Sequence, residues 1–321
     1  MKTSMIAVHL EKGRVSLESR PQPERLPGHA LIRMLYAGIC STDLHLRRGY
    51  YHFSGTPGHE FVGEVVACDG PRWLGKTVVG EINLACGTCA SCVAGMGRHC
   101  PARTVLGIVK HPGAFAEFLT LPEENLHRLP KHVPVHLGVF TEPIAAACEI
   151  LEQVKIPKGV QVAVLGDGKL GLLIAQVLQL HGASVHLFGR HKEKMRLVES
   201  LGIDTEVMQD RIPLAQYRFV VECTGSSAGL NQAVQMVTPR GTLIMKSTVH
   251  GKVTLDTAPI IVQEITMVGS RCGRFAPALK LLASGNLILE PLIHDRLPLG
   301  LAARAFDRAA ERGVLKVLLE N

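Results

Sequence analysis

The first 130 residues alternate short apolar runs with turns that contain glycine and proline. Five runs have the length and composition of strands, at residues 5–10, 29–39, 60–68, 76–82 and 114–121. Runs of this length between turn residues are typical of strands in a compact β structure. The pattern therefore predicts a small barrel or sandwich in this part of the chain.

The pattern changes near residue 143. A β-rich run at residues 160–166 precedes a segment, 169–183, whose apolar positions recur at helical spacing up to Gly182. Further strand-like runs follow at residues 184–189, 219–225 and 241–247. Strands that alternate with helices predict an α/β fold with a doubly wound parallel sheet, whose ligands bind at the carboxyl ends of the strands.

The C-terminal part of the chain departs from this alternation. Two helices are predicted there, at residues 277–285 and 302–313, before the apolar segment 316–320. We therefore divide the chain into residues 1–142, 143–268 and 269–321. At roughly 150 residues per domain, the length of 321 residues indicates about two domains.

Composition and charge narrow the possible functions. Apolar residues make up 46% of the chain and charged residues 20%, which is ordinary globular usage and argues against disorder. The net charge of +7 is scattered without long basic runs, and aromatic residues make up only 4%. These features favour a phosphate-bearing cofactor over nucleic acid as the anionic partner. The chain has no segment typical of a membrane span or a signal peptide, so we expect a cytoplasmic protein.

Four of the nine cysteines lie close together, which indicates a metal site in a cytoplasmic protein. Cys86, Cys89, Cys92 and Cys100 occur in the segment CGTCASCVAGMGRHC, residues 86–100. Four thiolates suit tetrahedral zinc, and a closed shell of this kind has a structural role because it leaves no position for substrate. An iron–sulfur cluster and unligated cysteines remain alternatives.

A glycine-rich turn follows the run at residues 160–166 and precedes the predicted helix. Its glycines match the dinucleotide fingerprint G-x-G-x-x-G: Gly166 permits a tight turn, Gly168 allows the pyrophosphate to approach, and Gly171 allows close packing. A glycine turn without a ligand is the alternative. We predict that the whole turn binds cofactor, through Gly166, Asp167, Gly168, Lys169, Leu170 and Gly171.

The end of the next strand bears on the choice of cofactor. An NAD-binding site usually has an acidic residue there, which accepts hydrogen bonds from the ribose 2′-hydroxyl, but this chain has Gly189. Arg190, with His191 and Lys194, offers positive charge to a 2′-phosphate. We therefore expect NADP to be preferred, with NAD or dual use as the alternative. Arg190 and Lys194 could instead be solvated residues in the first turn of a helix, without a role in cofactor binding.

Two segments offer further metal ligands. Cys40 and His45 occur in GICSTDLHLRRG, and His59 and Glu60 in TPGHEFVGEVVACDG. Each residue alone is more often a packed core residue than a ligand. Together with the four-cysteine segment, the TEP triplet at residues 141–143 and the later glycine turn, in this order, they resemble the zinc-dependent medium-chain dehydrogenase/reductase family. This family includes alcohol, polyol, sugar and threonine dehydrogenases.

The resemblance implies a GroES-like catalytic domain followed by a Rossmann domain, with the C-terminal segment returning to the catalytic domain. It also implies a catalytic zinc held by Cys40, His59 and Glu142, with Glu60 as an adjacent carboxylate that coordinates or exchanges. Asp43 resembles the carboxylate that orients His59. Cys148 is a competing thiolate, although its position six residues after Glu142 favours a core role.

The resemblance further assigns residues to proton transfer and cofactor binding. Thr42 matches a hydroxyl relay and His45 a histidine that passes the proton to solvent, with local bonding and simple surface exposure as the alternatives. Lys316 resembles a basic residue that meets the cofactor pyrophosphate, or is an exposed lysine near the end of the chain. Thr224 and Lys246 are placed at the carboxyl edge of the sheet, near the nicotinamide half.

The predicted function is hydride transfer between a secondary alcohol, polyol or sugar-like hydroxyl, or its carbonyl, and a nicotinamide cofactor. The alternatives are a reductase of activated double bonds and a cofactor-binding protein without turnover. The expected partners are a small-molecule substrate and further copies of the chain, as a homodimer or homotetramer. We expect neither nucleic acid nor a membrane as a partner.

Overall fold

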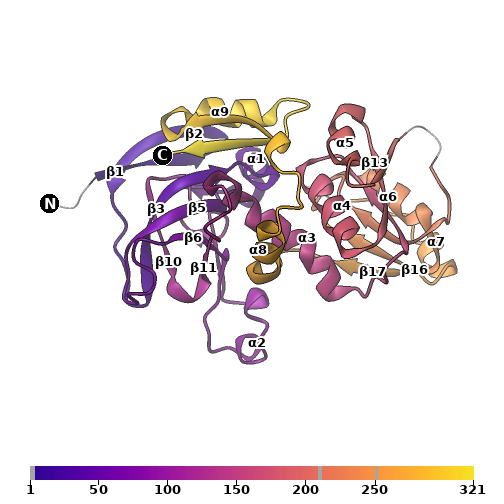
Figure 1. Cartoon of the computed structure of the whole chain (residues 1–321), viewed down its shortest axis with the longest axis horizontal. Coiled ribbons are helices and arrows are strands. Elements are labelled where there is room, and N and C mark those ends of the chain that lie inside the picture. The colour runs from indigo at the N-terminus through magenta and orange to yellow at the C-terminus, as the bar shows by residue number, and fades with distance from the viewer. Residues whose placement is uncertain (1–3, 209–211, 250–251) are drawn as a thin grey trace. The chain divides into compact units, whose positions relative to one another are not determined.

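The computed structural model describes residues 4–208, 212–249 and 252–321 (Figure 1). These residues form two compact units. The first unit contains the chain up to Glu142 together with Ala278–Gly285 and Ile293–Asn321, and the second contains Pro143–Pro277 and Asn286–Leu292. The C-terminal segment therefore belongs to the same unit as the N-terminal part of the chain.

A seven-stranded sheet forms the centre of the first unit. Its members are β3 (His29–Gly38), β5 (Glu60–Ala67), β6 (Thr77–Gly80), β10 (Phe118–Pro122), β11 (Leu126–Arg128), β18 (Ile293–Pro298) and β19 (Lys316–Glu320). The order is β11-β6-β5-β3-β19-β18, and β10 also pairs with β3. In this sheet β19 runs antiparallel to β3, with Leu318 opposite Gly38. The last strand of the chain thus lies beside the strand that leads to Cys40.

Two three-stranded sheets and several helices complete the first unit. The first sheet contains β1 (Ser4–Glu11), β2 (Arg14–Pro21) and β4 (Ser54–Gly55), and the second contains β7 (Asn83–Leu84), β8 (Thr104–Leu106) and β9 (Lys110–His111). Helices α1 (Ser41–Arg47), α2 (Ala90–Val93) and α9 (Ala302–Ala310) lie within the unit, and α8 (Phe275–Ala283) enters it. The sequence pattern missed β2 because most of its side chains are polar and exposed, so it has no apolar face.

The second unit is built on a six-stranded sheet in which every pairing is parallel. Its strand order is β14-β13-β12-β15-β16-β17. The bounds are β12 (Gln161–Leu165), β13 (Ser184–Gly189), β14 (Asp204–Val207), β15 (Tyr217–Glu222), β16 (Val237–Met245) and β17 (Thr266–Gly269). The order reverses at β12, where doubly wound sheets bind their ligands. The predicted α/β fold is confirmed.

The helices of this part of the chain either lead into its first parallel strand or connect parallel strands that follow one another. They are α3 (Thr141–Gln153), α4 (Lys169–His181), α5 (Lys192–Glu199), α6 (Ser227–Met236) and α7 (Ala258–Val262). Short 3₁₀ turns occur in the described chain at Tyr50–His52, Gly97–His99, Glu123–Asn125, Val135–Phe140, Glu290–Leu292 and Leu299–Leu301. Within residues 4–208, 212–249 and 252–321, no helix has the length and apolar character that a bilayer span requires.

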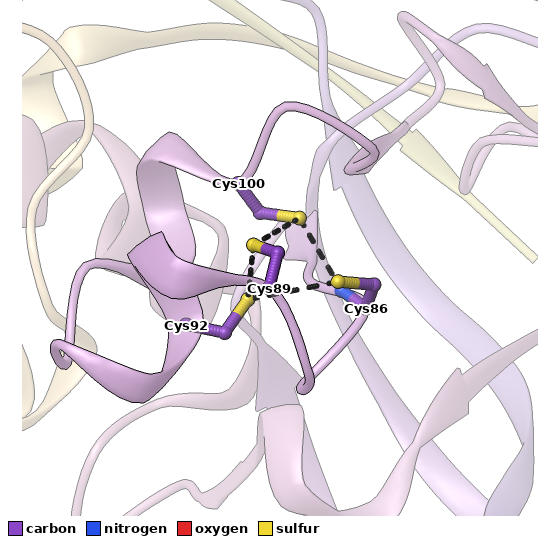
Figure 2. A group of neighbouring side chains, drawn as sticks. All are labelled: Cys86, Cys89, Cys92 and Cys100. Atoms are coloured by element: carbon purple, nitrogen blue, oxygen red, sulfur yellow. Dashed lines mark hydrogen bonds between the residues drawn. The ribbon is translucent and has the colours of Figure 1, made fainter.

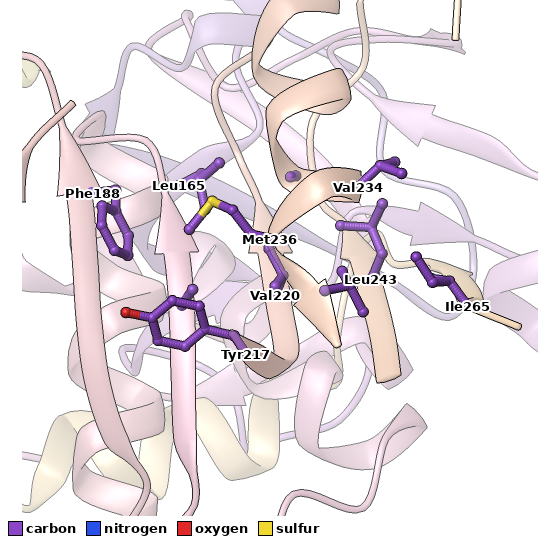
Figure 3. Close-up of a cluster of buried hydrophobic side chains, with 11 residues drawn as sticks. Leu165, Phe188, Tyr217, Val220, Val234, Met236, Leu243 and Ile265 are labelled. Atoms are coloured by element: carbon purple, nitrogen blue, oxygen red, sulfur yellow. The ribbon is translucent and has the colours of Figure 1, made fainter. Parts of the chain in front are cut away.

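An apolar cluster packs α6 against the parallel sheet (Figure 3). Val234 and Met236 come from the helix, whereas Val220 and Leu243 come from β15 and β16, and all four are at most 2% exposed. Burial of a side chain of this size contributes about 1.5–3 kcal/mol. The cluster stabilises the strands whose carboxyl ends carry the cofactor-site candidates.

Candidate functional site

The four cysteines of the segment 86–100 converge on one point (Figure 2). Their sulfur atoms lie 3.5 Å apart for Cys89 and Cys92, 3.7 Å for Cys89 and Cys100, and 3.9 Å for Cys86 and Cys92. Sulfurs bound to one tetrahedral zinc at about 2.3 Å lie roughly 3.8 Å from one another. A cluster of several iron atoms needs wider spacing between its thiolates. The geometry therefore fits a single zinc ion.

The local backbone prepares this loop for a cation. The backbone N–H groups of Thr88 and Cys89 lower the pKa of Cys86 to about 6. The thiolate, rather than the thiol, is the form that binds metal. Cys89 directly precedes α2 and Cys92 lies on it, so one helical turn sets the spacing of these two sulfurs. Burial and the neighbouring thiols raise the pKa of Cys92 to about 12, so Cys92 would lose its proton when the metal binds. The loop thus supplies pre-positioned ligands from a short stretch of sequence.

A second cluster brings together Cys40, His59 and Glu60, whose ligand atoms lie within 4.8 Å of one another. Cys40 is the residue that precedes α1, and Glu60 begins β5. His59 and Glu60 are 3% and 1% exposed, whereas Cys40 is partly exposed. A thiol, an imidazole and a carboxylate are a ligand set that suits zinc and leaves a position for a substrate.

Asp43 connects the two segments that supply this cluster. Its Oδ2 accepts a hydrogen bond of 2.8 Å from the backbone N–H of Cys40, and its Oδ1 accepts one of 3.3 Å from Gly58. Asp43 Oδ1 also lies 3.5 Å from the buried Nδ1 of His59, a nitrogen without a hydrogen-bond partner among the described residues. A carboxylate beside one nitrogen of an imidazole leaves the other nitrogen for a metal. The arrangement fits a metal-binding histidine.

The surroundings of His59 are strongly negative. Burial lowers the pKa of His59, but the Asp43 carboxylate and the Cys40 thiol outweigh burial and raise this pKa well above its ordinary value. The same negative surroundings favour a bound cation, which would take the place of the proton.

Glu60 carries a contact that the sequence did not indicate. Its Oε2 accepts a hydrogen bond from Lys316 Nζ, and Lys316 is completely buried. Gly38 makes room for this pair, because a Cβ there would lie 2.6 Å from Glu60 Oε2 and 3.3 Å from Lys316 Cδ. Burial lowers the pKa of Lys316, but the charge of Glu60 outweighs burial and raises it. Glu60 and Lys316 form a buried salt bridge.

This position of Lys316 differs from one of the two sequence-based expectations. A side chain that is completely buried and bonded to Glu60 is not an exposed terminal lysine, whereas its contact with a pyrophosphate stays a prediction. The physical reason is that β19 enters the central sheet beside β3, which turns Lys316 into the interior.

Glu142 and Cys148, the other candidate ligands, lie on α3. Neither is a member of the cluster within 4.8 Å formed by Cys40, His59 and Glu60. Burial, reinforced by the nearby Glu152, raises the pKa of Cys148 to about 11. A thiol that stays protonated and is 7% exposed has the character of a core residue.

Thr42 and His45 lie three residues apart on α1, a spacing that places two side chains on one face of a helix. Thr42 Oγ1 lies 3.8 Å from Cys40 Sγ, so this hydroxyl is close to the metal-site candidates. The His45 ring makes an edge contact with the ring of Tyr50, with their centroids 6.4 Å apart. The helix thus carries Thr42, Asp43 and His45 within two turns, directly after Cys40.

The glycine turn joins β12 to α4 as the pattern predicts. Gly166 has a φ of +122°, which other residues rarely adopt, and a Cβ at Gly171 would overlap the carbonyl oxygen of Gly166. Around Gly168, which caps α4, a Cβ would have no neighbour within 4 Å. Lys169 and Leu170 form the first turn of α4. This open helix start fits the pyrophosphate of a dinucleotide.

The residues after β13 surround the carboxylate of Asp167. Asp167 Oδ2 accepts hydrogen bonds from the backbone N–H groups of Arg190 at 2.8 Å and His191 at 2.6 Å. Arg190 is exposed, and Lys194 is partly exposed on α5. Gly189 is buried against Asp167. The glycine turn thus places the Asp167 carboxylate beside Gly189, at the end of β13, where the sequence has no acidic residue.

Thr224 and Lys246 follow β15 and β16 at the carboxyl edge of the sheet. Thr224 donates both its backbone N–H and its hydroxyl to Glu222 Oε1, at 2.6 Å each. Lys246 Nζ donates to the carbonyl oxygens of Ala146 at 2.6 Å and Arg271 at 2.8 Å. Glu222, 2% exposed, is a polar residue that sequence reasoning missed, and its only signal is an acidic residue that ends an apolar strand.

A GroES-like unit with two metal-fitting clusters and a doubly wound unit with a dinucleotide turn define a zinc-binding dehydrogenase. Family models support this class: residues 26–131 match the alcohol dehydrogenase GroES-like domain, and residues 170–284 match the zinc-binding dehydrogenase model. The chain belongs to the zinc-dependent medium-chain dehydrogenase family, and it is an oxidoreductase.

Individual relatives agree with this assignment. A D-altritol 5-dehydrogenase from Agrobacterium fabrum is 32% identical over 90% of this chain and 91% of its own length. A sorbitol dehydrogenase from Halalkalibacterium halodurans is 28% identical over 96% of both chains. A protein from Sinorhizobium meliloti 1021, named as a zinc-binding dehydrogenase and solved with bound NADP, is 29% identical with a TM-score of 0.90, covering 99% of this chain and 100% of its own.

Proposed function

We propose that the protein transfers hydride between a nicotinamide cofactor and a secondary alcohol, polyol or sugar-like hydroxyl, or the corresponding carbonyl. The observation that carries the proposal is the cluster of Cys40, His59 and Glu60, oriented by Asp43. The names of two relatives, D-altritol 5-dehydrogenase and sorbitol dehydrogenase, support a polyol as the substrate class.

Zinc at this cluster would supply a Lewis acid, and the cofactor would accept or donate the hydride. Cys40 and His59 would hold the metal, and Glu142 is the proposed third ligand. Glu60, already paired with Lys316, is the carboxylate that would exchange with it. Asp43 keeps the His59 ring and the start of α1 in the orientation that both ligands need.

Two residues of α1, Thr42 and His45, are the proposed proton-transfer groups. Thr42 Oγ1 is the proposed acceptor of the proton that leaves a substrate hydroxyl, because this oxygen lies 3.8 Å from the Cys40 sulfur, and Thr42 would pass its own hydroxyl proton on to His45. His45, on the same helix face, would carry the proton onward to water. The reverse path would protonate the product alcohol during carbonyl reduction.

We further assign a structural zinc to Cys86, Cys89, Cys92 and Cys100, for which the sulfur spacing is the support. Residues 1–142 are proposed as the catalytic domain, 143–268 as the Rossmann domain and 269–321 as the segment that returns to the catalytic domain. The place of β18 and β19 in the central sheet of the first unit supports this return. A homodimer or homotetramer in the cytoplasm remains our proposal from the family resemblance.

The test is turnover by the zinc-replete protein. Absorbance of the reduced nicotinamide is followed with a panel of polyols, sugars, simple secondary alcohols and their carbonyls, each with NAD and with NADP. The proposal expects a polyol or related alcohol to react, and expects Cys40→Ser to abolish the reaction and to lose one zinc. Cys68→Ser is the matched control, because Cys68 is a partly exposed thiol of the same unit outside both clusters. Reduction of an enone or quinone alone would contradict the proposal.

A further inference from the structure

The ribose end of the dinucleotide site holds an acidic group in an unusual place. In doubly wound sheets the residue that ends the second strand, here position 189, meets the ribose 2′-hydroxyl. A Cβ at Gly189 would lie 2.5 Å from Asp167 Cβ and 2.7 Å from Met195 Sδ. The Asp167 side chain therefore fills the volume that an acidic side chain at position 189 would need.

Asp167 also occupies the hydrogen-bond donors at this strand end. Its Oδ2 accepts bonds from the backbone N–H of Arg190 at 2.8 Å, from the backbone N–H of His191 at 2.6 Å and from His191 Nδ1 at 2.8 Å. Backbone N–H groups before a helix start are the donors that an added phosphate would use. Here they are already engaged by a carboxylate of the same chain.

The carboxylate carries a full negative charge at neutral pH. Burial raises the pKa of Asp167, but the bonds from the His191 side chain and from the two backbone N–H groups outweigh burial and lower it. Its side chain is 12% exposed, so the charge lies at the edge of the site and is little screened by water. A 2′-phosphate beside it would meet a like charge.

We propose that Asp167, from the turn after β12, replaces the missing acidic residue at the end of β13 and selects NAD(H) over NADP(H). Oδ2 holds the loop after β13, and Oδ1 accepts the ribose 2′-hydroxyl. This inference rests on the proposed use of a nicotinamide cofactor, and it reverses the preference expected from Gly189 and Arg190 in the sequence.

Two nucleotides isolate the effect of the 2′-phosphate without any turnover. Isothermal titration calorimetry of the full chain measures dissociation constants for 5′-AMP and for 2′,5′-ADP, and the same experiment compares NADH with NADPH. Because like charges in a binding site disfavour association, wild type is expected to bind 5′-AMP and NADH at least about tenfold more tightly than their 2′-phosphorylated counterparts. A wild-type preference for 2′,5′-ADP and NADPH overturns the inference whatever the variants do.

Asp167→Asn tests the residue itself. The amide oxygen still accepts the backbone bonds, whereas the charge is removed. The preference for 5′-AMP over 2′,5′-ADP is expected to fall by about tenfold, which is the size of one lost charge contact. Glu193→Gln is the matched control, because Glu193 is an exposed acidic residue in the first turn of α5.

Three outcomes, one from the variants and two from the wild type, separate the possibilities. Equal shifts in Asp167→Asn and Glu193→Gln overturn the specific role of Asp167, because general charge would then explain the preference. Wild type that binds neither 5′-AMP nor NADH contradicts the proposed function together with this inference. Binding of both nucleotides without a preference overturns the inference alone and leaves the proposed function standing.

Discussion

The two metal-fitting clusters of this protein differ in how the chain builds them. The four-cysteine loop draws its ligands from fifteen consecutive positions, 86–100, and its Cys86 is exposed. The second cluster draws Cys40 from the start of α1 and His59 and Glu60 from the start of β5, and its His59 and Glu60 are buried. A local site needs only a short loop to form, whereas a dispersed site depends on the surrounding sheet. The first is suited to holding structure and the second to chemistry.

The largest effect should come from His59→Ala. Loss of a ligand at the proposed catalytic zinc is expected to lower kcat/KM by at least about a thousandfold, because the Lewis acid is lost. The other zinc and the melting temperature should be retained, as measured by metal analysis and calorimetry.

His127→Ala serves as its control, because His127 is a partly exposed histidine of the same unit that pairs with Glu81. A comparable loss of activity in His127→Ala would contradict the proposed role of His59 as a ligand of the catalytic zinc.

Lys316→Met should destabilise the dispersed site itself. Without Lys316, Glu60 keeps a buried charge with no counter-ion, which costs about 3–5 kcal/mol in the zinc-free protein. Chemical denaturation of the zinc-free variant measures this loss. The double variant Lys316→Met with Glu60→Gln removes the orphaned charge, so it should recover much of the stability. Failure of the double variant to recover would argue that packing, rather than charge, determines the effect.

Cys89→Ser should lower the thermal stability of the protein, whereas His59→Ala should lower its activity and leave the melting temperature unchanged. A metal that closes a loop of fifteen residues acts like a cross-link, which is worth about 3 kcal/mol. The expected result is a melting temperature lower by roughly 6–12 °C, with one zinc still bound at the other cluster. Thermal unfolding alongside Cys68→Ser measures the difference. An unchanged melting curve would contradict a structural zinc.

The smallest effect is expected from Asp43→Asn. Asp43 lies outside the cluster of Cys40, His59 and Glu60, and loss of an orienting carboxylate typically weakens metal affinity about 10- to 100-fold. Competition with a zinc chelator measures this affinity at the dispersed cluster, while the four-cysteine loop acts as the internal reference. Equal weakening of both sites would show that the change acts on the whole unit.

Much of the fold could be read from the chain because its signals are local. Strands β12 and β13 and helix α4 coincide with apolar runs of the sequence that are largely buried. The turn at Gly166 requires a backbone conformation that glycine tolerates best. The exposed strand β2 left no such signal. The residues of both metal clusters were likewise visible as cysteine and histidine motifs.

The sequence did not predict which distant side chains contact one another. The sequence alone determined the family, the α/β fold, the cysteine spacing and the glycine turn, because each depends on neighbouring residues along the chain. Only the tertiary structure decided that Lys316 pairs with Glu60 across 256 positions, and that Asp167 fills the space beside Gly189. Buried charges take the partners that the folded sheets bring within hydrogen-bond distance, and spacing along the chain does not specify those partners.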